Sequence, residues 1–591
     1  MRQFRTLLLG ILMLVAVQPA HAQPASSGKP LLPKDAVSQL SLVGAEAAIA
    51  RSELIDVAQM PFTHAVRATT TAGPRTEWGV QLEMPVAADV KAGDVVLAHF
   101  WLRCVQSMTG EAFTGLVFEE SSEPFDKSAE MRVGARSEWT EVNIPFKAHR
   151  DFKPGEAHIC FRLGYERQSI EIGGVELTNY GTSVKIENLP RTRVSYTGRE
   201  ADAAWRQEAL ARIEKLRKAE MTVRVVDRAG KPIEGAAVHA QLTRHAFRFG
   251  TCVTTELLTS DTPDGKRYRD FIEKNFNWAV FENDMKWPAM IDGFSPKTDA
   301  ALDWLLERKI AVRGHNLIWP SWKWLPNQIV ALKDKPTELR EACANRVTGA
   351  VSHFAGKLVD WDVINEDYTN HEIMDVLGRD VMIDWFKLAN KADPKCRLFL
   401  NDFGILEGGR SSAHRQHFFE SLKFLQSGGA PIGGIGIQTH FGAVLPSPVE
   451  MLGVLDQLSE FDLPIELTEA SFNLDDRPLQ ADYMRDFMIA MFSHPNVRGV
   501  MLWGFWEKRH WRPQAALLAA DWSMRPHGQA WMDLVHKQWS SDVRAQTNAH
   551  GSAAARGFKG DYQITVSHNG KDKTATAHVD HDGEVITITL E

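Results

Sequence analysis

The apolar positions of the longer part of the chain alternate between short strand-like runs and longer amphipathic stretches. Eight apolar runs lie at 247–251, 278–282, 311–319, 358–366, 397–402, 435–440, 465–469 and 499–506. The amphipathic stretches between them include 301–308, 338–354, 379–391, 413–426 and 480–492, and their spacing is helical. Eight strand–helix repeats predict an α/β fold, a (β/α)8 TIM barrel over residues 245–540, whose active site would form at the C-terminal ends of the strands.

A doubly wound parallel sheet is the main alternative, because it also alternates strands and helices. Such a sheet commonly carries a glycine-rich phosphate loop after its first strand. The first apolar run here is followed by Cys252-Val253-Thr254-Thr255, which contains no glycine. The barrel is therefore the better prediction.

Residues 36–190 show a different pattern, with apolar residues at every second position. Examples are the segments 95–101, 139–142, 159–163 and 170–172. This spacing predicts an all-β sandwich, and the order of its strands resembles the jelly-roll, carbohydrate-binding-like modules that accompany many polysaccharide-degrading enzymes. Such modules bind sugar or act as inert spacers, and the sequence leaves both open.

Two smaller regions flank the predicted barrel. Residues 191–244 predict a connector made of a helix near 201–219 and a strand pair, from the apolar spacing of the segment. Residues 541–591 predict a linker and a small β appendage. In its last part, from about 556, alternating apolar residues and turns at Asn569-Gly570 and Asp582-Gly583 indicate a three-stranded C-terminal β meander.

The N-terminal segment predicts export. Arg2 and Arg5 precede an apolar run at 7–17, and Ala20-His21-Ala22 offers a cleavage site after Ala22. These are the parts of a signal peptide over residues 1–22, and the apolar run is too short to anchor the chain in a bilayer. A flexible leader follows at 23–35. We therefore expect a secreted or periplasmic protein with no membrane span.

Charge and aromatic content narrow the function. The formal net charge of −8 argues against a nucleic-acid partner, which would call for a basic face. Fourteen of the eighteen tryptophans lie between Trp278 and Trp539. Flat aromatic faces suit the stacking of sugar rings, although we assign about half of these residues to the core.

The cysteines suggest no metal centre. The chain has five, at Cys104, Cys160, Cys252, Cys343 and Cys396, and their spacing matches no metal-binding motif. Cys104 and Cys160 lie in strand-like segments of one region, so a disulfide between them and two separate buried thiols both remain open. We expect no cofactor, no metal and a monomer.

Polar and aromatic residues gather at the predicted C-terminal ends of seven of the eight strands. One buried polar residue at a strand end is often only a satisfied core group, but seven such ends are difficult to explain by packing. Together they indicate a sugar-binding cleft. The residues are Glu282, Asn283, Lys286, Trp287, Arg313, His315, Asn316, Trp319, Asn365, Glu366, Asn401, Asp402, Gln438, Thr439, His440, Glu469, Trp503 and Trp511.

Two of these residues, Glu366 and Glu469, form a candidate catalytic pair. Glycoside hydrolysis needs two carboxyl groups, and in a retaining enzyme one attacks the anomeric carbon while the other protonates the leaving oxygen. Strands four and seven lie on opposite sides of an eight-stranded barrel, so these two side chains can face each other across its mouth. The negative charge of one raises the pKa of the other, which keeps the acid protonated.

These segments resemble glycoside hydrolase family 10, the barrel xylanases, over residues 200–540. Trp361-Asp362-Val363-Ile364-Asn365-Glu366 is similar to the acid/base motif of the family, and Ile465-Glu466-Leu467-Thr468-Glu469 is similar to its nucleophile motif. Further matches in family order are the segments 283–287, 313–315, 400–402, 434–438 and 503–504, followed by Trp511.

The resemblance implies a role for each matching residue. It makes Glu366 the acid/base and Glu469 the nucleophile of a retaining endo-1,4-β-xylanase acting on xylan or a related plant cell-wall polysaccharide. It makes Asn365 a ligand of the sugar 2-hydroxyl and His440 a support for the nucleophile. The residues that it places in the glycone subsites are Glu282, Asn283, Lys286, His315, Trp319, Gln438, Trp503 and Trp511. Asp402 is left outside the catalytic set, as a loop anchor.

Three positions depart from the family pattern. Pro320 replaces the usual histidine after Trp319, and Trp322 replaces a glutamine. Ser471 replaces an acidic residue, which leaves His440 without its usual carboxylate partner and should lower the basicity of that imidazole. The departures keep two alternatives open: a β-glycanase of altered specificity and a non-catalytic polysaccharide-binding protein. Neither an H-E-x-x-H metal motif nor a G-x-S-x-G elbow occurs in the sequence.

Overall fold

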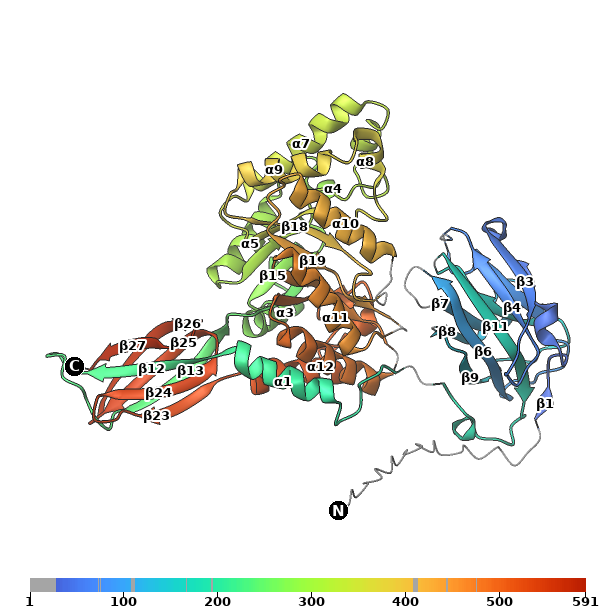
Figure 1. Ribbon diagram of the computed structural model, residues 1–591, viewed down its shortest axis with the longest axis horizontal. Helices are drawn as coiled ribbons and strands as arrows, with labels where there is room; N and C mark the ends of the chain where they lie inside the picture. Colours follow the sequence, from blue (N-terminus) through green and yellow to red (C-terminus); the bar gives the residue numbers. More distant parts are fainter. Residues whose placement is uncertain are drawn as a thin grey trace, which may run out of the picture. The chain divides into compact units, whose positions relative to one another are not determined.

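A computed structural model describes residues 28–590 apart from 73, 75, 108–111, 136, 166, 193–194, 408–412, 443–444 and 475. The predicted signal peptide and most of the predicted leader lie outside the described residues. The chain divides into two compact units, one with residues 1–106 and 112–193 and the other with residues 107–111 and 194–591 (Figure 1).

The first unit is a sandwich of two antiparallel sheets, which confirms the predicted all-β region. One sheet has the order β3-β4-β11-β6-β9, with β1 beside β11, and the other has the order β2-β5-β10-β7-β8. Inward-facing side chains of both sheets meet in one apolar core, where the rings of Phe100 and Phe161 pack edge to face at 5.0 Å. The strands are β1 (Lys29–Pro30), β2 (Ser41–Val43), β3 (Ala50–Asp56), β4 (His64–Thr70), β5 (Gln81–Pro85), β6 (Val95–Ser107), β7 (Ala112–Glu120), β8 (Lys127–Ala135), β9 (Thr140–Lys147), β10 (Ala157–Arg162) and β11 (Gln168–Asn179).

The second unit contains the predicted barrel. Eight parallel strands follow one another in chain order, and pairing of β14 with β22 and of β19 with β21 closes the sheet. The strands are β14 (Arg248–Val253), β15 (Trp278–Phe281), β16 (Ala311–Gly314), β17 (Asp360–Asn365), β18 (Arg397–Asp402), β19 (Gly434–Ile437), β21 (Ile465–Phe472) and β22 (Val497–Leu502), with the short β20 (His440–Phe441) beside β21.

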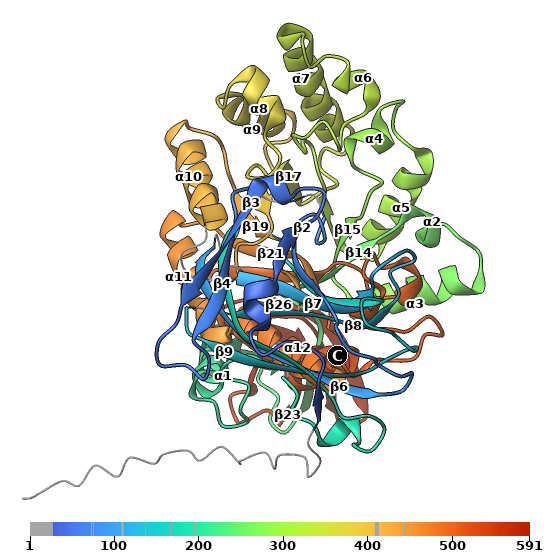
Figure 2. The same cartoon turned by 90° about the vertical axis from the view of Figure 1, so that its right-hand side faces the viewer.

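Helices surround this barrel, as Figure 2 shows for α5, α7, α10 and α11. Their apolar faces pack on the strands in one large core, which is why amphipathic stretches separate the apolar runs of the sequence. The longer helices are α3 (Pro263–Asn275), α5 (Pro296–Glu307), α7 (Pro336–His353), α9 (Val381–Ala392), α10 (Ala413–Ser427), α11 (Pro448–Leu458), α12 (Arg477–Ser493) and α13 (Pro526–Asp533). The shorter ones are α2 (Thr255–Leu258), α4 (Trp287–Met290), α6 (Asn327–Val330) and α8 (Glu372–Leu377).

The C-terminal segment is not an isolated meander, and here the structure differs from the sequence-based expectation. The hairpin of β25 and β26 is present, but the last strand β27 leaves it and pairs in parallel with β12. The predicted connector strands β12 and β13 therefore join the C-terminal strands in one sandwich, with sheets β24-β12-β27 and β23-β13-β25-β26. Turn residues mark a local hairpin, whereas nothing local encodes a partner strand more than 300 residues away. The elements are α1 (Ala204–Leu216), β12 (Lys218–Val226), β13 (Ala237–His245), β23 (Asp542–Gln546), β24 (Ser552–Phe558), β25 (Gly560–His568), β26 (Lys571–Val579) and β27 (Glu584–Thr589).

The connector helix α1 packs against α12 of the barrel. Arg206 of α1 donates two hydrogen bonds to the buried Asp486 of α12, at 3.0 and 2.7 Å. Tyr196 donates a third to the same carboxylate at 2.8 Å. Because this carboxylate is fully buried and ionic, these donors offset its desolvation and fix the helix in place.

All five cysteines are free and buried, so the two thiols of the sandwich, Cys104 and Cys160, do not form a disulfide. Among the described residues, no helix combines the length and the apolar character that crossing a bilayer requires.

Candidate active site

Glu366 follows directly on β17, at the C-terminal end of a barrel strand. Its backbone has a φ of 62°, a left-handed conformation that a non-glycine residue adopts at an energetic cost and that is frequent at functional sites. The backbone N–H of Glu366 donates to the carbonyl of Asn401 on the neighbouring strand β18 at 2.8 Å. This hydrogen bond stabilises the turn that directs the carboxyl group into the barrel mouth.

The carboxyl group of Glu366 is held by four N–H donors. Gln438 donates to Oε1 at 2.8 Å and Asn365 donates to the same oxygen at 3.1 Å. Trp319 and Asn370 each donate to Oε2 at 3.1 Å. Burial raises the pKa of Glu366 and the charge of Glu469 raises it further, while the hydrogen bonds from these donors oppose the rise. The group therefore has a fixed orientation and a tendency to hold a proton.

Glu469 lies on β21 and is 4% exposed. Asn401 donates to its Oε1 at 3.0 Å, and Nε2 of His440 lies 3.2 Å from its Oε2. Its pKa is raised overall, by burial first and also by the charge of Asp362, while the nearby charges of His315 and Lys286 and the hydrogen bond from Asn401 oppose the rise. One carboxylate oxygen thus faces an amide and the other faces an imidazole.

Asn401 connects the two glutamates. Its Nδ2 donates to Glu469 and also, at 2.8 Å, to Oδ1 of Asn365, whose own Nδ2 donates to Glu366. Thr468 fixes the orientation of this amide by donating to its Oδ1 at 2.7 Å. The sequence marked Asn401 as the polar end of a strand and as part of a family-like segment, without a role, and no local signal marked Asn370. The contacts of Asn401 form only when β17, β18 and β21 come together, and that of Asn370 forms through the turn of the loop after β17.

His440 is held in one tautomer by its two neighbours. Its Nδ1 lies 2.9 Å from the hydroxyl of Ser471, and its Nε2 faces the carboxylate of Glu469. Burial and the charge of Arg512 lower the pKa of His440 to about 3. The neutral ring then carries its proton on Nε2, pointing at Glu469, and accepts the hydroxyl proton of Ser471 at Nδ1. The direction is the one expected from the sequence, but its causes are burial and Arg512 rather than the missing carboxylate partner.

A buried ionic network lies beneath the two glutamates inside the barrel. Nδ1 of His315 lies 2.9 Å from Asp362, and Arg313 binds both Asp362 and Glu466. Burial acts to raise the pKa of Asp362, but the neighbouring Arg313 and His315 lower it overall. This network orients His315, whose Nδ1 is 4.0 Å from Oε1 of Glu469.

Aromatic side chains border the glutamates on both sides. Trp319, which donates to Glu366, stacks on Trp324 with ring centres 4.4 Å apart. On the side of Glu469, the ring of His440 contacts Trp511 at 4.9 Å, and Trp511 is 48% exposed. Trp503 is buried and packs edge to face on His315 at 5.3 Å. Two exposed or half-exposed aromatic faces therefore border the polar centre.

The residues after β15 lie at the edge of this centre. Glu282 is half-buried, and burial raises its pKa. Lys286 donates to Asn283 at 2.9 Å, and its ammonium lies 5.1 Å from the ring centre of Trp319. Asn283 is exposed, and its side-chain oxygen accepts this hydrogen bond from Lys286.

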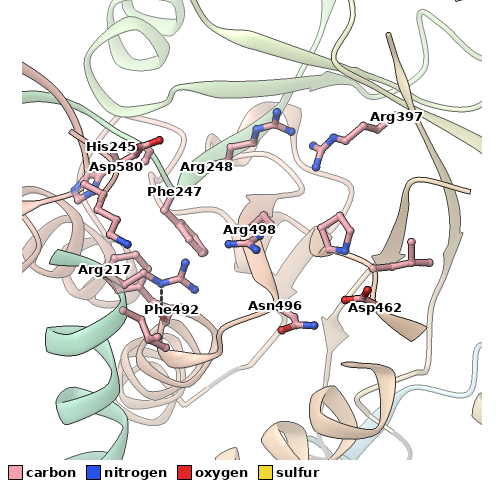
Figure 3. Close-up of a pocket in the computed structure, with 15 residues that line it drawn as sticks. Arg217, His245, Phe247, Arg248, Arg397, Asp462, Phe492, Asn496, Arg498 and Asp580 are labelled. Atoms are coloured by element: carbon pink, nitrogen blue, oxygen red, sulfur yellow. Dashed lines mark hydrogen bonds between the residues drawn. The ribbon is translucent and has the colours of Figure 1, made fainter. Parts of the chain in front are cut away.

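A large cavity at the opposite end of the barrel is separate from this site. It has a volume of about 620 Å³ and is lined by residues at the starts of the strands, including Phe247, Arg248 and Arg397 (Figure 3). Arg248 and Arg397 both bind the buried Glu466, at 3.0 and 2.7 Å. Catalytic groups of TIM barrels occupy the C-terminal ends of the strands, so this cavity belongs to the stabilising end of the fold.

The chain is similar to one protein family and to several individual proteins. A family model described as glycosyl hydrolase family 10 matches residues 238–530. The chain is 36% identical over 378 residues to the anti-sigma-I factor RsgI6 of Acetivibrio thermocellus, which covers 62% of this chain and 47% of that protein. It is 31% identical over 463 residues to endo-1,4-beta-xylanase 1 of Arabidopsis thaliana, covering 73% of this chain and 47% of that protein. It is 30% identical over 277 residues to a beta-1,4-xylanase of Dictyoglomus thermophilum, covering 41% of this chain and 75% of that protein.

The chain thus spans about half the length of the first two of these relatives and three quarters of the third. The family match contains all the residues of the candidate site, from Glu282 to Trp511. On these grounds, the chain belongs to glycosyl hydrolase family 10.

Proposed function

We propose that the chain is a retaining endo-1,4-β-xylanase with Glu366 as acid/base and Glu469 as nucleophile. The observation that carries the proposal is the hydrogen-bonded path from Glu366 through Asn365 and Asn401 to Glu469. It holds two buried carboxyl groups together at the C-terminal ends of barrel strands. The names of the xylanase relatives support xylan as the substrate.

The different surroundings of the two carboxyl groups support this division of roles. The charge of Glu469 raises the pKa of Glu366, which favours a protonated Glu366 next to an ionised Glu469. An ionised carboxylate is also the better acceptor for the Nε2–H of His440. Glu469 is therefore suited to attack, and Glu366 is suited to give up a proton.

The reaction proceeds in two displacements. In the first, an oxygen of Glu469 bonds to the anomeric carbon while the bond to the leaving oxygen breaks and Glu366 transfers its proton to that oxygen. In the second, Glu366, now a carboxylate, takes a proton from a water molecule whose oxygen attacks the anomeric carbon and releases Glu469. Two inversions give net retention of configuration.

The aromatic borders support an extended chain as the substrate. Trp319 and Trp324 form one face beside Glu366, and Trp511 forms another beside His440 and Glu469. These faces would bind sugar rings on the glycone side of the cleaved bond, where the family resemblance places Trp319 and Trp511. We further propose that the protein works as a monomer outside the cytoplasm, secreted or periplasmic, for which residues 1–22 supply the signal.

A β-glycanase of altered specificity is the second candidate. Pro320 and Trp322 occupy positions beside Trp319, where the family pattern differs. Pro320 is buried and its carbonyl accepts from Ile373, while Trp322 is half-buried against the barrel core. These contacts fix the loop that carries the tryptophan pair, so they bear on which sugars fit beside Glu366.

Hydrolysis assays test the proposed function and the alternatives. We expect reducing-sugar release from glucuronoxylan and arabinoxylan that exceeds release from carboxymethyl cellulose and mixed-linkage glucan by about 100-fold, since specific polar contacts discriminate between substrates by several kcal/mol. Proton NMR of the earliest product should show the β-anomer. Faster cleavage of a glucan would favour the second candidate. Binding of xylan without hydrolysis would contradict the enzyme and support a non-catalytic binding protein.

Ser471 gives a prediction about pH dependence. Ser471→Ala removes the donor to Nδ1 of His440, so the ring can move its proton to Nδ1 and present a lone pair to Glu469. The ionised form of Glu469 is then less stable and its pKa rises. Since Glu469 must be ionised, the acid limb of the kcat/KM profile should move to higher pH. The activity should fall about tenfold, because a hydrogen bond to a charged group contributes about 1.5 to 3 kcal/mol.

Ser471→Asp should act in the opposite direction. An aspartate accepts from Nδ1, which favours the doubly protonated His440, and the resulting cation lowers the pKa of Glu469. The acid limb should therefore move to lower pH. Ser459→Ala is the control, because that hydroxyl donates to the carbonyl of Leu455 at the end of α11, remote from the site. A shift in the same direction for both Ser471 variants would refute this account.

A further inference from the structure

A second groove lies in the β-sandwich unit, away from the catalytic pair. It has a volume of about 530 Å³. It lies over the sheet β2-β5-β10-β7-β8, on the face that turns away from the apolar core. Ile159 and Phe161 of β10 point into the core. Because side chains alternate along a strand, His158 and Arg162 point to the opposite face. The residues that line it are Trp78, Gln81, Glu83, Glu119, Pro124, Phe125, Lys127, Glu130, His158 and Arg162.

The floor of this groove consists of buried polar groups. Glu119, His158 and Arg162 are only 4%, 5% and 5% exposed, although they lie outside the apolar core of the sandwich. Nε2 of His158 lies 3.1 Å from Glu119, and Arg162 binds Glu130 at 2.5 Å. Among the described residues, however, Nδ1 of His158 and Nε of Arg162 have no hydrogen-bond partner. These two atoms are inaccessible from the groove, so the polar groups that a ligand can reach are the less buried lining side chains Gln81, Glu83 and Lys127.

The charges that line the groove nearly cancel. Three carboxylates, Glu83, Glu119 and Glu130, face two permanent cations and His158. Lys127 lies 3.0 Å from Glu119, and Arg162 lies 3.5 Å from the same carboxylate. An ionic ligand would leave one sign of these charges unpaired in a mostly buried site, which is costly. Closely spaced donors and acceptors suit an uncharged ligand with many hydroxyl groups.

Exposed aromatic rings stand at the two ends of the groove. Trp78 is 56% exposed and Phe125 is 41% exposed, although both line the cavity. Trp78 lies near the C-terminal end of β10. The backbone N–H of Gly164, just after Arg162, donates to the carbonyl of Glu77, the residue before Trp78. Phe125 follows β7, whose last residue Glu120 lies opposite Ala157 at the other end of β10.

The groove therefore runs along β10 between two aromatic faces. His158 and Arg162 are four residues apart on this strand, which corresponds to about 13 Å at a rise of about 3.3 Å per residue. This length exceeds a single sugar ring, and a ligand pocket that combines aromatic walls with a few polar groups is typical of a specific binding site. Arg162 also extends the face of Trp78, with its guanidinium 5.7 Å from the ring centre.

We propose that this groove is a second, non-catalytic binding site for a chain of uncharged β-1,4-linked sugars. Trp78 and Phe125 stack on rings at its two ends, and the more accessible polar side chains that line it, Gln81, Glu83 and Lys127, bind hydroxyl groups. The choice of xylan as the ligand rests on the proposed function of the barrel, whereas the site itself rests on the residues of the sandwich. The groove would hold the enzyme on a solid polysaccharide while the barrel cuts it.

Depletion binding to insoluble xylan tests the proposal in the full chain. The parent is the double variant Glu366→Gln, Glu469→Gln, so that the polysaccharide is not cut during the measurement. Adding Trp78→Ala or Phe125→Ala should weaken retention about tenfold, as for aromatic anchors of other interfaces. Trp78→Phe should keep most of the binding. The matched control is Leu54→Ala, a side chain that is 51% exposed on β3, in the other sheet.

Activity on soluble xylotetraose separates this site from the barrel. In the background with both glutamates intact, Trp78→Ala should change kcat/KM for xylotetraose less than twofold, and all variants should melt at the temperature of the parent. Unchanged retention of Trp78→Ala and Phe125→Ala would overturn the groove, as would a fall in xylotetraose activity equal to the fall in retention. Stronger retention on anionic polygalacturonate than on xylan would overturn the uncharged ligand. If the intact enzyme cut no xylan but Trp78→Ala still lost retention, the proposed function would fail and the groove would stand.

Discussion

Replacing Glu469 by alanine is expected to lower kcat on xylan by about 10⁴ to 10⁶, the range found when a catalytic nucleophile is removed. The carboxylate is 4% exposed and receives hydrogen bonds from Asn401 and His440, so the site holds it in one orientation, and an alanine side chain carries no group that can attack in its place. Loss of its negative charge should also lower the pKa of Glu366, because that charge raises it in the native site. Steady-state kinetics measures the first effect, and 13C NMR of a labelled Glu366 carboxyl group measures the second.

External azide provides the chemical signature of this variant. An alanine at position 469 leaves room for the anion on the side from which the nucleophile attacks. With an aryl β-xylobioside as substrate, azide should restore turnover and give the α-glycosyl azide, because only one inversion takes place. Unchanged melting of Glu469→Ala is the control for folding. A β-azide product, or kcat within tenfold of the native enzyme, would contradict the role of Glu469.

Replacing Glu366 by alanine is expected to lower kcat on xylan by about 10² to 10⁴, the usual contribution of general acid–base catalysis. The loss should depend on the leaving group. A 2,4-dinitrophenyl xylobioside needs no proton to leave, so formation of the glycosyl enzyme should stay fast while its hydrolysis becomes slow. A burst of dinitrophenol followed by a slow phase is the expected result in stopped-flow absorbance.

Azide should distinguish this variant from the first. Here the anion replaces water in the second displacement, so the product should be the β-glycosyl azide, with net retention. Glu366→Gln is the matched control for packing, because glutamine fills the same space between Gln438, Trp319 and Asn370 but cannot transfer the proton. Equal losses on xylan and on the dinitrophenyl substrate would show that Glu366 does not protonate the leaving group.

Much of the barrel and of the candidate site could be predicted from sequence because both depend on local order. Short apolar runs and stretches of helical period follow one another eight times, and a TIM barrel places consecutive strands side by side. Residues at the ends of those runs must then gather at one end of the barrel. Glu366 and Glu469 could be paired in this way without coordinates.

The hydrogen-bond partners of those glutamates could not be predicted in the same way. Asn370 lies in the loop after β17, and its amide reaches Glu366 only through the turn that the loop makes. From the sequence, Ser471 was notable only because it replaces an acidic residue. In the structure, its hydroxyl group contacts His440. Side-chain direction within a loop depends on packing between elements, and a one-dimensional pattern carries little information about it.

The sequence by itself determined the order of the elements, the barrel and the sandwich, and it placed Glu366 and Glu469 at one end of the barrel. It could do so because periodicity and strand ends are local properties. Only the tertiary structure decided that β12 pairs with β27, that Asn401 links Glu366 to Glu469, and that Trp78 and Phe125 border one groove. Each of these depends on residues far apart in the chain, and their contact is set by the packing of whole sheets.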